Sequence, residues 1–517
     1  MNPFPTKIRT LLLLCLMPVC LTGCSSDSGE EGGMPAGVTG DLYGYVKDTA
    51  GAPVQGVVIS DGYTCTATDA EGFYSLTRNT SAYYVYYSVP ADCRVEVDER
   101  GLPLFYQKLT KSQKQYDFTL TRQAKETRFR MLAIGDPQVT STAQVYRFEN
   151  ETVSDIRAYI ASRPDDLPTY AITLGDIVGN HWELFPNMVK AMDRAKASVP
   201  VFQTIGNHDH EYPQTNNIAS QRTYESYFGP VNYSFTRGDV HFVSMDNVIH
   251  KATASADYDG GFLDWQYEWI KQDLSYVPKD KTVVLCVHIP FRNGFSAGDG
   301  VYYNEMLELL SQYDRAHVFA GHVHCNKVEF THTVNSKKIR EYIPGAACGA
   351  WWHGTVCTDG TPNGYGVFEF DGGRLANTIL KPTRYDETFQ LRLYNASDIF
   401  TGGGSTNYKF AVTGKNQIIA NIWNADDSWR FEVYENGVKT ADGLKKVTSR
   451  DAWSTAYFYG FCKLTASAYG GTNQHTYYYT KQNADATVRI VAYDGYGNVF
   501  EQSEITTPAA SDYPDAY

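Results

Sequence analysis

The chain has 517 residues, enough for roughly three domains of ordinary size. Its content of 43% hydrophobic and 20% charged residues is that of a folded globular protein, which excludes a wholly disordered chain. The net charge of −13 argues against binding of a nucleic-acid duplex, because a phosphate backbone requires a face rich in Lys and Arg, although bound metal ions can still bring an acidic protein to a phosphate group.

The first 37 residues have the features of a targeting segment. Lys7 and Arg9 precede an apolar run over 11–21, which is too short to span a bilayer and fits a secretory signal peptide over 1–23. The sequence Leu-Thr-Gly-Cys at 21–24 resembles a bacterial lipobox, which implies a lipid on Cys24 that anchors the protein to the membrane, followed by a flexible tether over 24–37. This acidic tether is similar to those of lipoproteins sent to the outer leaflet, so we expect a lipid-anchored protein of the bacterial cell envelope, in the outer membrane and exposed at the surface. A short apolar helix with an incidental cysteine is the alternative.

Residues 38–121 alternate short strands with turn signals such as Asp61-Gly62, a pattern typical of a β-sandwich. The run GYVKDTAGAPVQGVVISDG, followed by TDAEGFYSL, resembles the carboxypeptidase regulatory-like sandwich, which implies a spacer or docking module.

From Arg128 the pattern changes to apolar strands that alternate with amphipathic stretches at 185–196 and 261–274. This alternation predicts a layered α/β domain over 127–385.

Alternating strands return over 386–517, with hairpin turns expected at Asn436-Gly437 and Asp494-Gly495, and they predict a second β-sandwich. The expected fold is therefore multidomain, with a central α/β domain flanked by two all-β domains.

Seven cysteines remain once Cys24 and the two in the signal peptide are set aside, so at least one thiol is unpaired. Cys65–Cys93 and Cys348–Cys357 are candidate disulfides, although sequence alone does not fix the pairing.

Polar side chains follow five apolar strands of the central domain, each where the strand ends. The strands lead into these residues: Asp136 after 131–134, Asp176 after 171–174, Asn207 and His208 after 201–205, His288 after 282–287, and His322 and His324 after 317–320. In layered α/β folds, ligands bind at the carboxyl ends of the strands, so these groups are expected to converge on one crevice. A single Gly-Asp at a strand end is more often a turn, but five such endings in this order make coincidence negligible.

The residue types at these strand ends favour two divalent cations. Asp and Asn oxygens together with imidazole nitrogens suit borderline ions such as Zn, Mn or Fe. If its side chain is shared between the two ions, residue 176 must be an acid and not an amide, which explains Asp176. Two ions roughly 3.5–4 Å apart can clamp a phosphoryl oxygen and activate a water.

The motifs GDP, GDxV, GNHD, VHxP and GHxH, in this order, resemble the calcineurin-like metallophosphoesterase family over residues 127–385. The resemblance implies a double-sheet sandwich with outer helices and two bound divalent metal ions. It implies one ion held by Asp136, Asp176 and His324, and a second held by Asp176, Asn207, His288 and His322. It also implies attack by a metal-bridging hydroxide, with His208 assisting the leaving group, and we expect Asp209 to orient His208.

The first motif departs from the family's usual Asp-x-His, because Gln138 stands in the third position. A neutral amide oxygen is a weaker ligand than imidazole, so Gln138 is expected to make the first metal site looser or to select a different ion. The segment 345–370 is similar to a lipoprotein branch of the family whose catalytic domain lies between a sandwich and a C-terminal β domain. Arg292, Trp351 and Trp352 are candidate substrate contacts, with a surface Arg and partly core Trp residues as the plainer alternatives.

These features predict an extracytoplasmic hydrolase of a phosphate mono- or diester, whose substrate is a phosphorylated small molecule or polymer. One alternative is a surface lipoprotein that binds a glycan or peptide and keeps a vestigial catalytic domain, which only Gln138 favours. A metal-dependent hydrolase of non-phosphate esters is a weaker alternative, since a two-ion clamp suits a tetrahedral phosphoryl group.

Overall fold

The computed structural model describes residues 38, 40–214, 216–251, 257–291, 300–398, 412–464 and 472–506, with only the backbone at 328–330, 398 and 461. From Gly40 onward the chain forms one compact unit. The predicted signal peptide, the tether and Cys24 lie outside the described residues, as does Arg292. Among the described helices, none combines the length and the apolar character needed to cross a membrane.

The N-terminal region consists of two small sheets. One has the strand order β4-β1-β7 and the other β3-β2-β5-β6. Asp48, Asp61 and Asp69 accept backbone N–H groups of the following residues, so each predicted turn is closed by its own aspartate. The strands are β1 (Leu42–Asp48), β2 (Val58–Ser60), β3 (Cys65–Ala67), β4 (Phe73–Leu76), β5 (Tyr84–Tyr87), β6 (Tyr106–Lys108) and β7 (Phe118–Leu120).

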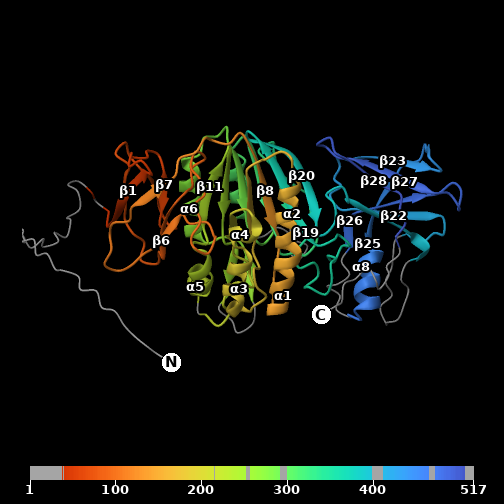
Figure 1. Ribbon diagram of the computed structural model, residues 1–517, viewed down its shortest axis with the longest axis horizontal. Helices are drawn as coiled ribbons and strands as arrows, with labels where there is room; N and C mark the ends of the chain where they lie inside the picture. Colours follow the sequence, from red (N-terminus) through yellow and green to blue (C-terminus); the bar gives the residue numbers. More distant parts are fainter. Residues whose placement is uncertain are drawn as a thin grey trace, which may run out of the picture. The chain divides into compact units, whose positions relative to one another are not determined.

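The central region is built on two larger sheets that face each other (Figure 1). The five-stranded sheet has the order β10-β9-β8-β19-β20, and the six-stranded sheet has the order β11-β12-β15-β16-β18-β17. Aromatic side chains fill the space between them: the ring centroids of Phe202 and Phe235 lie 3.9 Å apart, and those of Phe319 and Phe368 lie 4.1 Å apart. The predicted double-sheet α/β architecture is thus present.

The strands of the first sheet are β8 (Arg128–Ile134), β9 (Thr169–Leu174), β10 (Val201–Thr204), β19 (Gly364–Asp371) and β20 (Arg374–Pro382). Those of the second are β11 (Tyr233–Arg237), β12 (Val240–Ser244), β15 (Thr282–Cys286), β16 (Arg315–Phe319), β17 (Lys327–Val334) and β18 (Lys337–Ile343). A short hairpin of β13 (Val248–His250) and β14 (Tyr258–Gly260) lies between β12 and β15 in the chain.

Helices accompany both sheets. The helices α1 (Thr142–Arg147) and α2 (Ser154–Ser162), joined by a π-helical turn, share a core with β8 and β9, and α3 (Phe185–Ala191) and α4 (Arg194–Ala197) join the same core. The helices α6 (Asp264–Ser275) and α7 (Tyr303–Leu310) pack in the core of the second sheet. The helix predicted over 185–196 is broken, because Asp193 caps a new helix by accepting the N–H of Ala195.

The C-terminal region contains two four-stranded sheets, β21-β22-β26-β25 and β24-β23-β27-β28. The strands are β21 (Leu391–Asn395), β22 (Gln417–Ile422), β23 (Arg430–Glu435), β24 (Val438–Lys439), β25 (Lys445–Arg450), β26 (Thr472–Thr480), β27 (Val488–Tyr493) and β28 (Val499–Gln502). The predicted Asn436-Gly437 turn joins β23 to β24, and both residues have positive φ. A short helix, α8 (Ala452–Thr455), follows β25. All seven described cysteines are free, so neither candidate disulfide is formed.

Candidate metal centre

The predicted polar residues come together where strands of the two sheets end. Because β8, β9 and β10 run parallel in one sheet and β15 and β16 run parallel in the other, their carboxyl ends deliver side chains to one place. These side chains are buried or half-buried, and several belong to residues with left-handed backbone conformation: Asp136, Gln138, Asp176, His322 and His324. Such conformations cost free energy in non-glycine residues and concentrate at functional sites.

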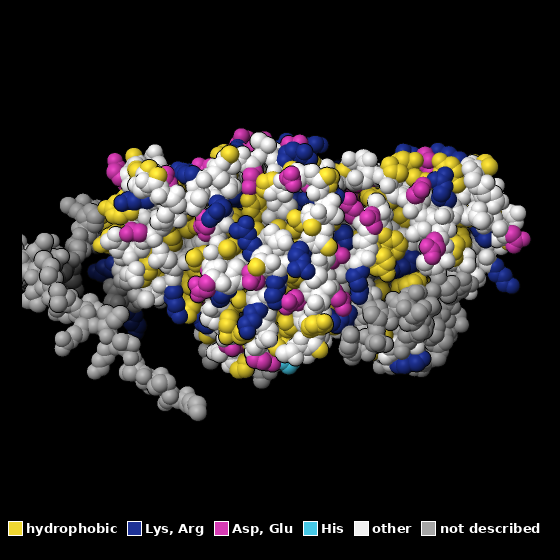
Figure 2. Space-filling model, in the orientation of Figure 1, with side chains coloured by type: hydrophobic (Ala, Val, Ile, Leu, Met, Phe, Trp, Pro, Cys, Tyr) yellow, Lys and Arg dark blue, Asp and Glu magenta, His cyan; other side chains and the backbone are white. Residues whose placement is uncertain are grey.

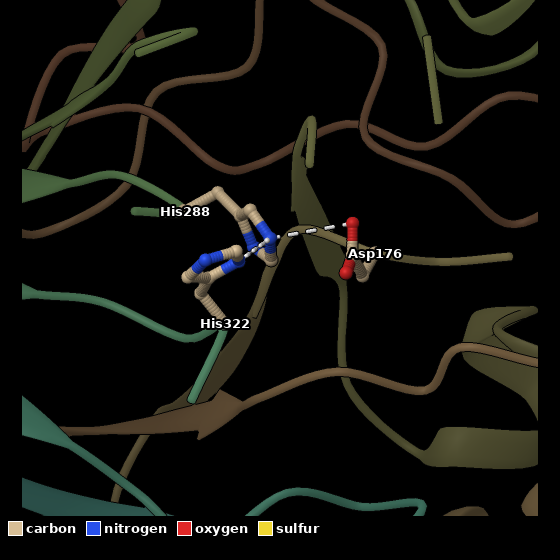
Figure 3. Close-up of side chains that lie close together, drawn as sticks. All are labelled: Asp176, His288 and His322. Carbon is tan, nitrogen blue, oxygen red and sulfur yellow. Dashed lines mark hydrogen bonds and ion pairs between the residues drawn. The ribbon is translucent and has the colours of Figure 1, made fainter. Parts of the chain in front are cut away.

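Two groups of ligand atoms share one carboxylate. Asp136, Asp176 and His324 form one group, and Asp176, His288 and His322 form the other; within each group the ligand atoms lie within 4.8 Å of one another. Figure 3 shows the His288 imidazole directed toward Asp176, with Nε2 at 3.3 Å from Asp176 Oδ1, and the His322 imidazole beside it, with Nδ1 at 3.2 Å from His288 Nε2. Asn207 belongs beside this second group, because its Oδ1 lies 2.9 Å from His288 Nε2 and 3.0 Å from His322 Nδ1.

The donor atoms fit a cation. His288 Nδ1 donates to the Leu174 carbonyl at 2.8 Å, which leaves Nε2 beside Asn207 Oδ1 and Asp176 Oδ1. Gln138 donates through Nε2 to Asp176 Oδ2 at 3.0 Å, and its buried Oε1 has no hydrogen-bond partner among the described residues. An unsatisfied buried oxygen beside a shared carboxylate is suited to a metal ion, as predicted for Gln138.

The electrostatics keep two of the imidazoles in the form that binds metals. Burial, together with the charge of His288, lowers the pKa of His322 to about 3, and burial lowers that of His324 to about 4. Burial raises the pKa of Asp136 to about 7. For Asp176 the opposing effect of burial is outweighed by His288, so its pKa lies below the usual range. His288 differs: against the effect of burial, the Asp176 carboxylate raises the pKa of His288 to about 9, so this imidazole releases a proton when it binds a metal.

His208 lies beside this centre but is oriented by other residues than predicted. Its backbone N–H donates to Asp176 Oδ1 at 2.9 Å, and its Nδ1 lies 2.6 Å from Asn180 Oδ1. The Tyr212 hydroxyl donates to the same amide oxygen and lies 3.2 Å from His208 Nδ1. With Nδ1 donating to Asn180, His208 Nε2 is left to hold or release a proton.

The prediction that Asp209 orients His208 is wrong. The Asp209 carboxylate is fully buried and accepts the backbone N–H groups of Gly206, Ile177 and Val178 at 2.9, 3.1 and 3.0 Å. It therefore ties the loop after β9 to the loop after β10. Because these loops carry Asp176 and Asn207, Asp209 positions metal ligands and does not touch the His208 ring.

The two tryptophans have different places. Trp351 packs against a predicted ligand, with its ring centroid 4.6 Å from that of His324 and the two ring planes tilted by 32°. Trp352 is 2% exposed, donates its indole N–H to the Pro137 carbonyl at 2.8 Å and lies under the Arg147 guanidinium, so its prediction as a substrate contact is wrong. Both have left-handed φ, so the chain curls here, and Trp352 enters the core, in line with the plainer alternative of a core tryptophan.

Sequence reasoning missed four residues around the centre. Asn180 and Tyr212 hold His208, Asn247 Oδ1 accepts the His288 backbone N–H at 3.1 Å, and Cys348 Sγ lies 3.5 Å from His324 Nδ1. Asn180 lies four residues after Asp176, at the end of a Gly-Asp motif, where a polar residue could have been noticed. Tyr212, Asn247 and Cys348 lie on other loops, where the chain carries no such signal.

Comparisons with known proteins agree with this geometry. Residues 40–123 match a model of the N terminal of calcineurin-like phosphoesterase, 129–326 the calcineurin-like phosphoesterase model itself, and 341–500 a model of the C terminal of calcineurin-like phosphoesterase. Among solved structures, a candidate 5′-nucleotidase from Staphylococcus aureus matches with 13% identity and a TM-score of 0.31, over 51% of this chain and 55% of that chain. At this level the likeness carries no functional meaning.

Three curated relatives come from Arabidopsis thaliana. Purple acid phosphatase 23 is 35% identical over 26% of this chain and 30% of its own, and purple acid phosphatase 15 is 32% identical over 26% of each. Purple acid phosphatase 18 is 29% identical over 32% of this chain and 38% of its own. The chain thus spans less than two fifths of the length of the curated relatives it matches. Since three family models together match most of its length and the strand-end residues converge as their motifs require, the chain belongs to the calcineurin-like phosphoesterase family.

Proposed function

We propose that this protein is an extracytoplasmic, metal-dependent hydrolase of a phosphate mono- or diester. The observation that carries the proposal is the pair of ligand groups that share Asp176, with His208 bound to the same carboxylate through its backbone N–H. The names of the curated relatives, all purple acid phosphatases, support a phosphate ester as the substrate class.

Both proposed sets of metal ligands contain the shared carboxylate of Asp176. Asp136, Asp176 and His324, with Gln138 beside them, would hold one ion, and Asp176, Asn207, His288 and His322 would hold the other. When bound, two divalent ions neutralise phosphoryl oxygens and lower the pKa of water so that it becomes a nucleophile. Manganese, zinc and iron all suit these donors.

The chain's own residues supply the proton and the geometry. His208, held through Nδ1 by Asn180, presents Nε2 for protonation of the leaving oxygen. Asp209 fixes the distance between the loops that carry Asp176 and Asn207. Trp351, packed against His324, lies where it can contact the body of a substrate whose phosphate reaches the ligands.

The surrounding regions complete the proposal. Residues 38–121 and 386–517 would be β-sandwich domains around a catalytic domain over 127–385, as in the lipoprotein branch that the sequence resembles. A signal peptide over 1–23 and a lipid on Cys24 would place the enzyme on the envelope membrane, where a phosphorylated small molecule or polymer is the expected partner.

The proposal is tested on residues 34–517 by elemental analysis of bound metal and by assays with chromogenic phosphate monoesters and diesters. We expect His208→Asn to keep its metal and to lose roughly 10²–10⁴-fold in turnover, since it removes only a proton donor. Asp176→Asn should lose both metal and turnover. Full turnover in both variants would contradict the mechanism. A wild-type protein without metal or turnover would favour the binding lipoprotein instead.

A further inference from the structure

A second cavity lies between the central and C-terminal regions, away from the metal centre. Its volume is about 750 Å³, within the range of pockets for small organic ligands. It is lined by Arg315 and His317 of β16, by Lys338 and Arg340 of β18, and by Arg374 of β20. Arg315 begins β16, whereas His322 follows its other end. At about 3.3 Å per residue, Arg315 therefore lies on the order of 15 Å from the metal ligands, whereas Tyr342, which also lines the cavity, pairs with Phe319 nearer to them.

The lining carries more positive than negative charge. Arg315, Lys338, Arg340 and Arg374 face two carboxylates, Asp426 and Asp427. Asp426 is engaged by Arg340 at 2.6 Å, and Asp427 lies 3.8 Å from Lys446 outside the cavity. No ion pair to Arg315, Lys338 or Arg374 occurs among the described residues.

This concentration of cations is unusual for the chain. The protein has a net charge of −13, and basic and acidic side chains are intermixed on the face in Figure 2. Several arginines around one hollow repel each other, and such an arrangement persists where an anion relieves the repulsion. Arginine also presents paired N–H groups that match phosphate, sulfate and carboxylate oxygens.

The remaining lining groups are suited to a hydroxylated ring. His317 Nδ1 is buried without a hydrogen-bond partner among the described residues. Burial and the neighbouring Arg340 and Arg315 lower the pKa of His317 to about 4, so its ring adds no positive charge to the wall. Tyr342 and Tyr496, whose hydroxyls lie 3.4 Å apart, add phenol rings and hydroxyl groups. Hydroxyls of Thr331, Thr333 and Ser428 complete the wall.

We propose that this cavity is a binding site for a small acidic saccharide, a sugar that carries two or more phosphate, sulfate or carboxylate groups. The arginines and Lys338 bind the charged groups, and the tyrosines and hydroxyl side chains contact the ring. The site is separate from the metal centre and does not depend on hydrolysis.

Calorimetric titration with sucrose octasulfate tests the proposal, because sulfate esters are not substrates of a phosphate ester hydrolase. We expect saturable binding of one molecule that weakens as salt is raised. The double variant Arg315→Gln/Arg374→Gln should bind at least about 10-fold more weakly, the equivalent of losing one charge-assisted hydrogen bond. Because both residues are exposed, the fold should survive, as thermal unfolding would verify.

Three further variants of this chain complete the test. Lys111→Gln/Lys114→Gln removes the same charge from exposed lysines of the N-terminal region and should bind within about twofold of the wild type. Thr333→Trp fills the cavity without changing charge and should weaken binding. Asp176→Asn disrupts the metal centre and should bind normally. Any one of four results would overturn the proposal. The first two are absence of saturable binding by the wild type and equal weakening in both double variants. The others are unchanged binding by Thr333→Trp and loss of binding in Asp176→Asn.

Discussion

At the scale of single residues, the environment of His208 is the least expected feature of the centre. An amide oxygen, that of Asn180, accepts from its Nδ1, and the Tyr212 hydroxyl shares that oxygen. A neutral amide fixes the ring without adding negative charge, so it stabilises a protonated imidazole less than a carboxylate would. The residue at 180 should therefore influence how turnover depends on pH.

Replacing Asn180 tests this role. In Asn180→Asp, the high-pH limb of the turnover profile should move upward by about one pH unit, because a carboxylate favours the protonated ring. Asn180→Ala should lower turnover by about 10–100-fold while bound metal is retained. pH–rate profiles and elemental analysis provide the measurements. Tyr212→Phe, which keeps the Asn180 contact, serves as the milder control. An unchanged profile in Asn180→Asp would show that residue 180 has no influence on the proton donor.

The sequence predicts metal ligands better than their supports. Asp136, Asp176, Asn207 and His288 each follow an apolar strand directly, so local pattern and parallel topology together are enough to bring them to one place. Tyr212 reaches His208 through a fold of the intervening loop that no local pattern encodes. Trp352 was misplaced because the backbone at 351–352 adopts left-handed φ, which bulky residues rarely adopt and a sequence pattern does not reveal.

At the scale of elements, the turn after β9 depends on close backbone approach. Gly175 has φ of +86°, and a Cβ there would lie 2.5 Å from His288 Nδ1 and 2.9 Å from Gly206 Cα. A side chain at residue 175 would push the His288 ring away from the second ligand group. The glycine at this strand end therefore serves the metal centre as well as the turn.

Gly175→Ala should consequently lose bound metal and turnover, measured by elemental analysis and chromogenic assay. Gly437→Ala is the matched control, because it also has positive φ, at +82°, but a Cβ there meets nothing within 4 Å. The control should lose about 1 kcal/mol of stability from backbone strain and keep its metal. Equal metal content in both variants would show that the contact with His288 is unimportant.

A second element, the helix α5 (Asn217–Phe228), contains a carboxyl group that links stability to pH. Burial raises the pKa of Glu225 from 4.5 to about 7, against the opposing charge of Arg222, 2.6 Å away. Between these values the folded protein retains a proton that the unfolded chain has released. The free energy of unfolding should therefore fall as pH rises from about 4.5 to 7.

Glu225→Gln should remove that contribution, up to about 3 kcal/mol between the ends of the window, as measured by urea unfolding at several pH values. Glu268→Gln on α6 is the control, since Glu268 is exposed and pairs with Lys271 at a similar spacing. If the free energy of unfolding of Glu225→Gln depended on pH as that of the wild type does, Glu225 would not be the group responsible.

At the scale of the whole molecule, the C-terminal region is joined through Asp359 to the segment that follows His324. Asp359, in the loop after Trp351, accepts the Asn326 backbone N–H at 2.9 Å, two residues beyond His324, and lies 3.1 Å from His475 Nε2 of β26. Its backbone carbonyl accepts from Asn421 of β22 at 2.9 Å and from Asn473 of β26 at 3.1 Å. These bonds connect the GHVH segment to the C-terminal sheet.

Asp359→Asn should reduce stability by about 2–3 kcal/mol and weaken metal retention, because one amide oxygen cannot replace the two carboxylate oxygens that contact Asn326, Thr361 and His475. Unfolding by urea and metal content after dialysis provide the two measurements. Asp371→Asn, at an exposed hairpin in the same region, should change neither. If Asp359→Asn retains as much metal as the wild type, the hydrogen bonds of Asp359 stabilise the fold but do not help to hold the metal.

The sequence predicted the presence of the all-β regions but not this connection. Alternating strands show that residues 386–517 form sheets, whereas nothing in their pattern shows which loop they hold. Buried polar side chains of β22 and β26, such as Asn421 and His475, were the available clue, since a polar group inside a sheet requires a partner.

The bonds of Asp359 also limit how relatives of this protein can exchange parts. A chimera that takes residues 386–517 from another member of the family must bring along the segment around Asp359, or its new sheet will meet a loop shaped for a different neighbour. The two stretches should therefore be inherited, and engineered, as a single unit.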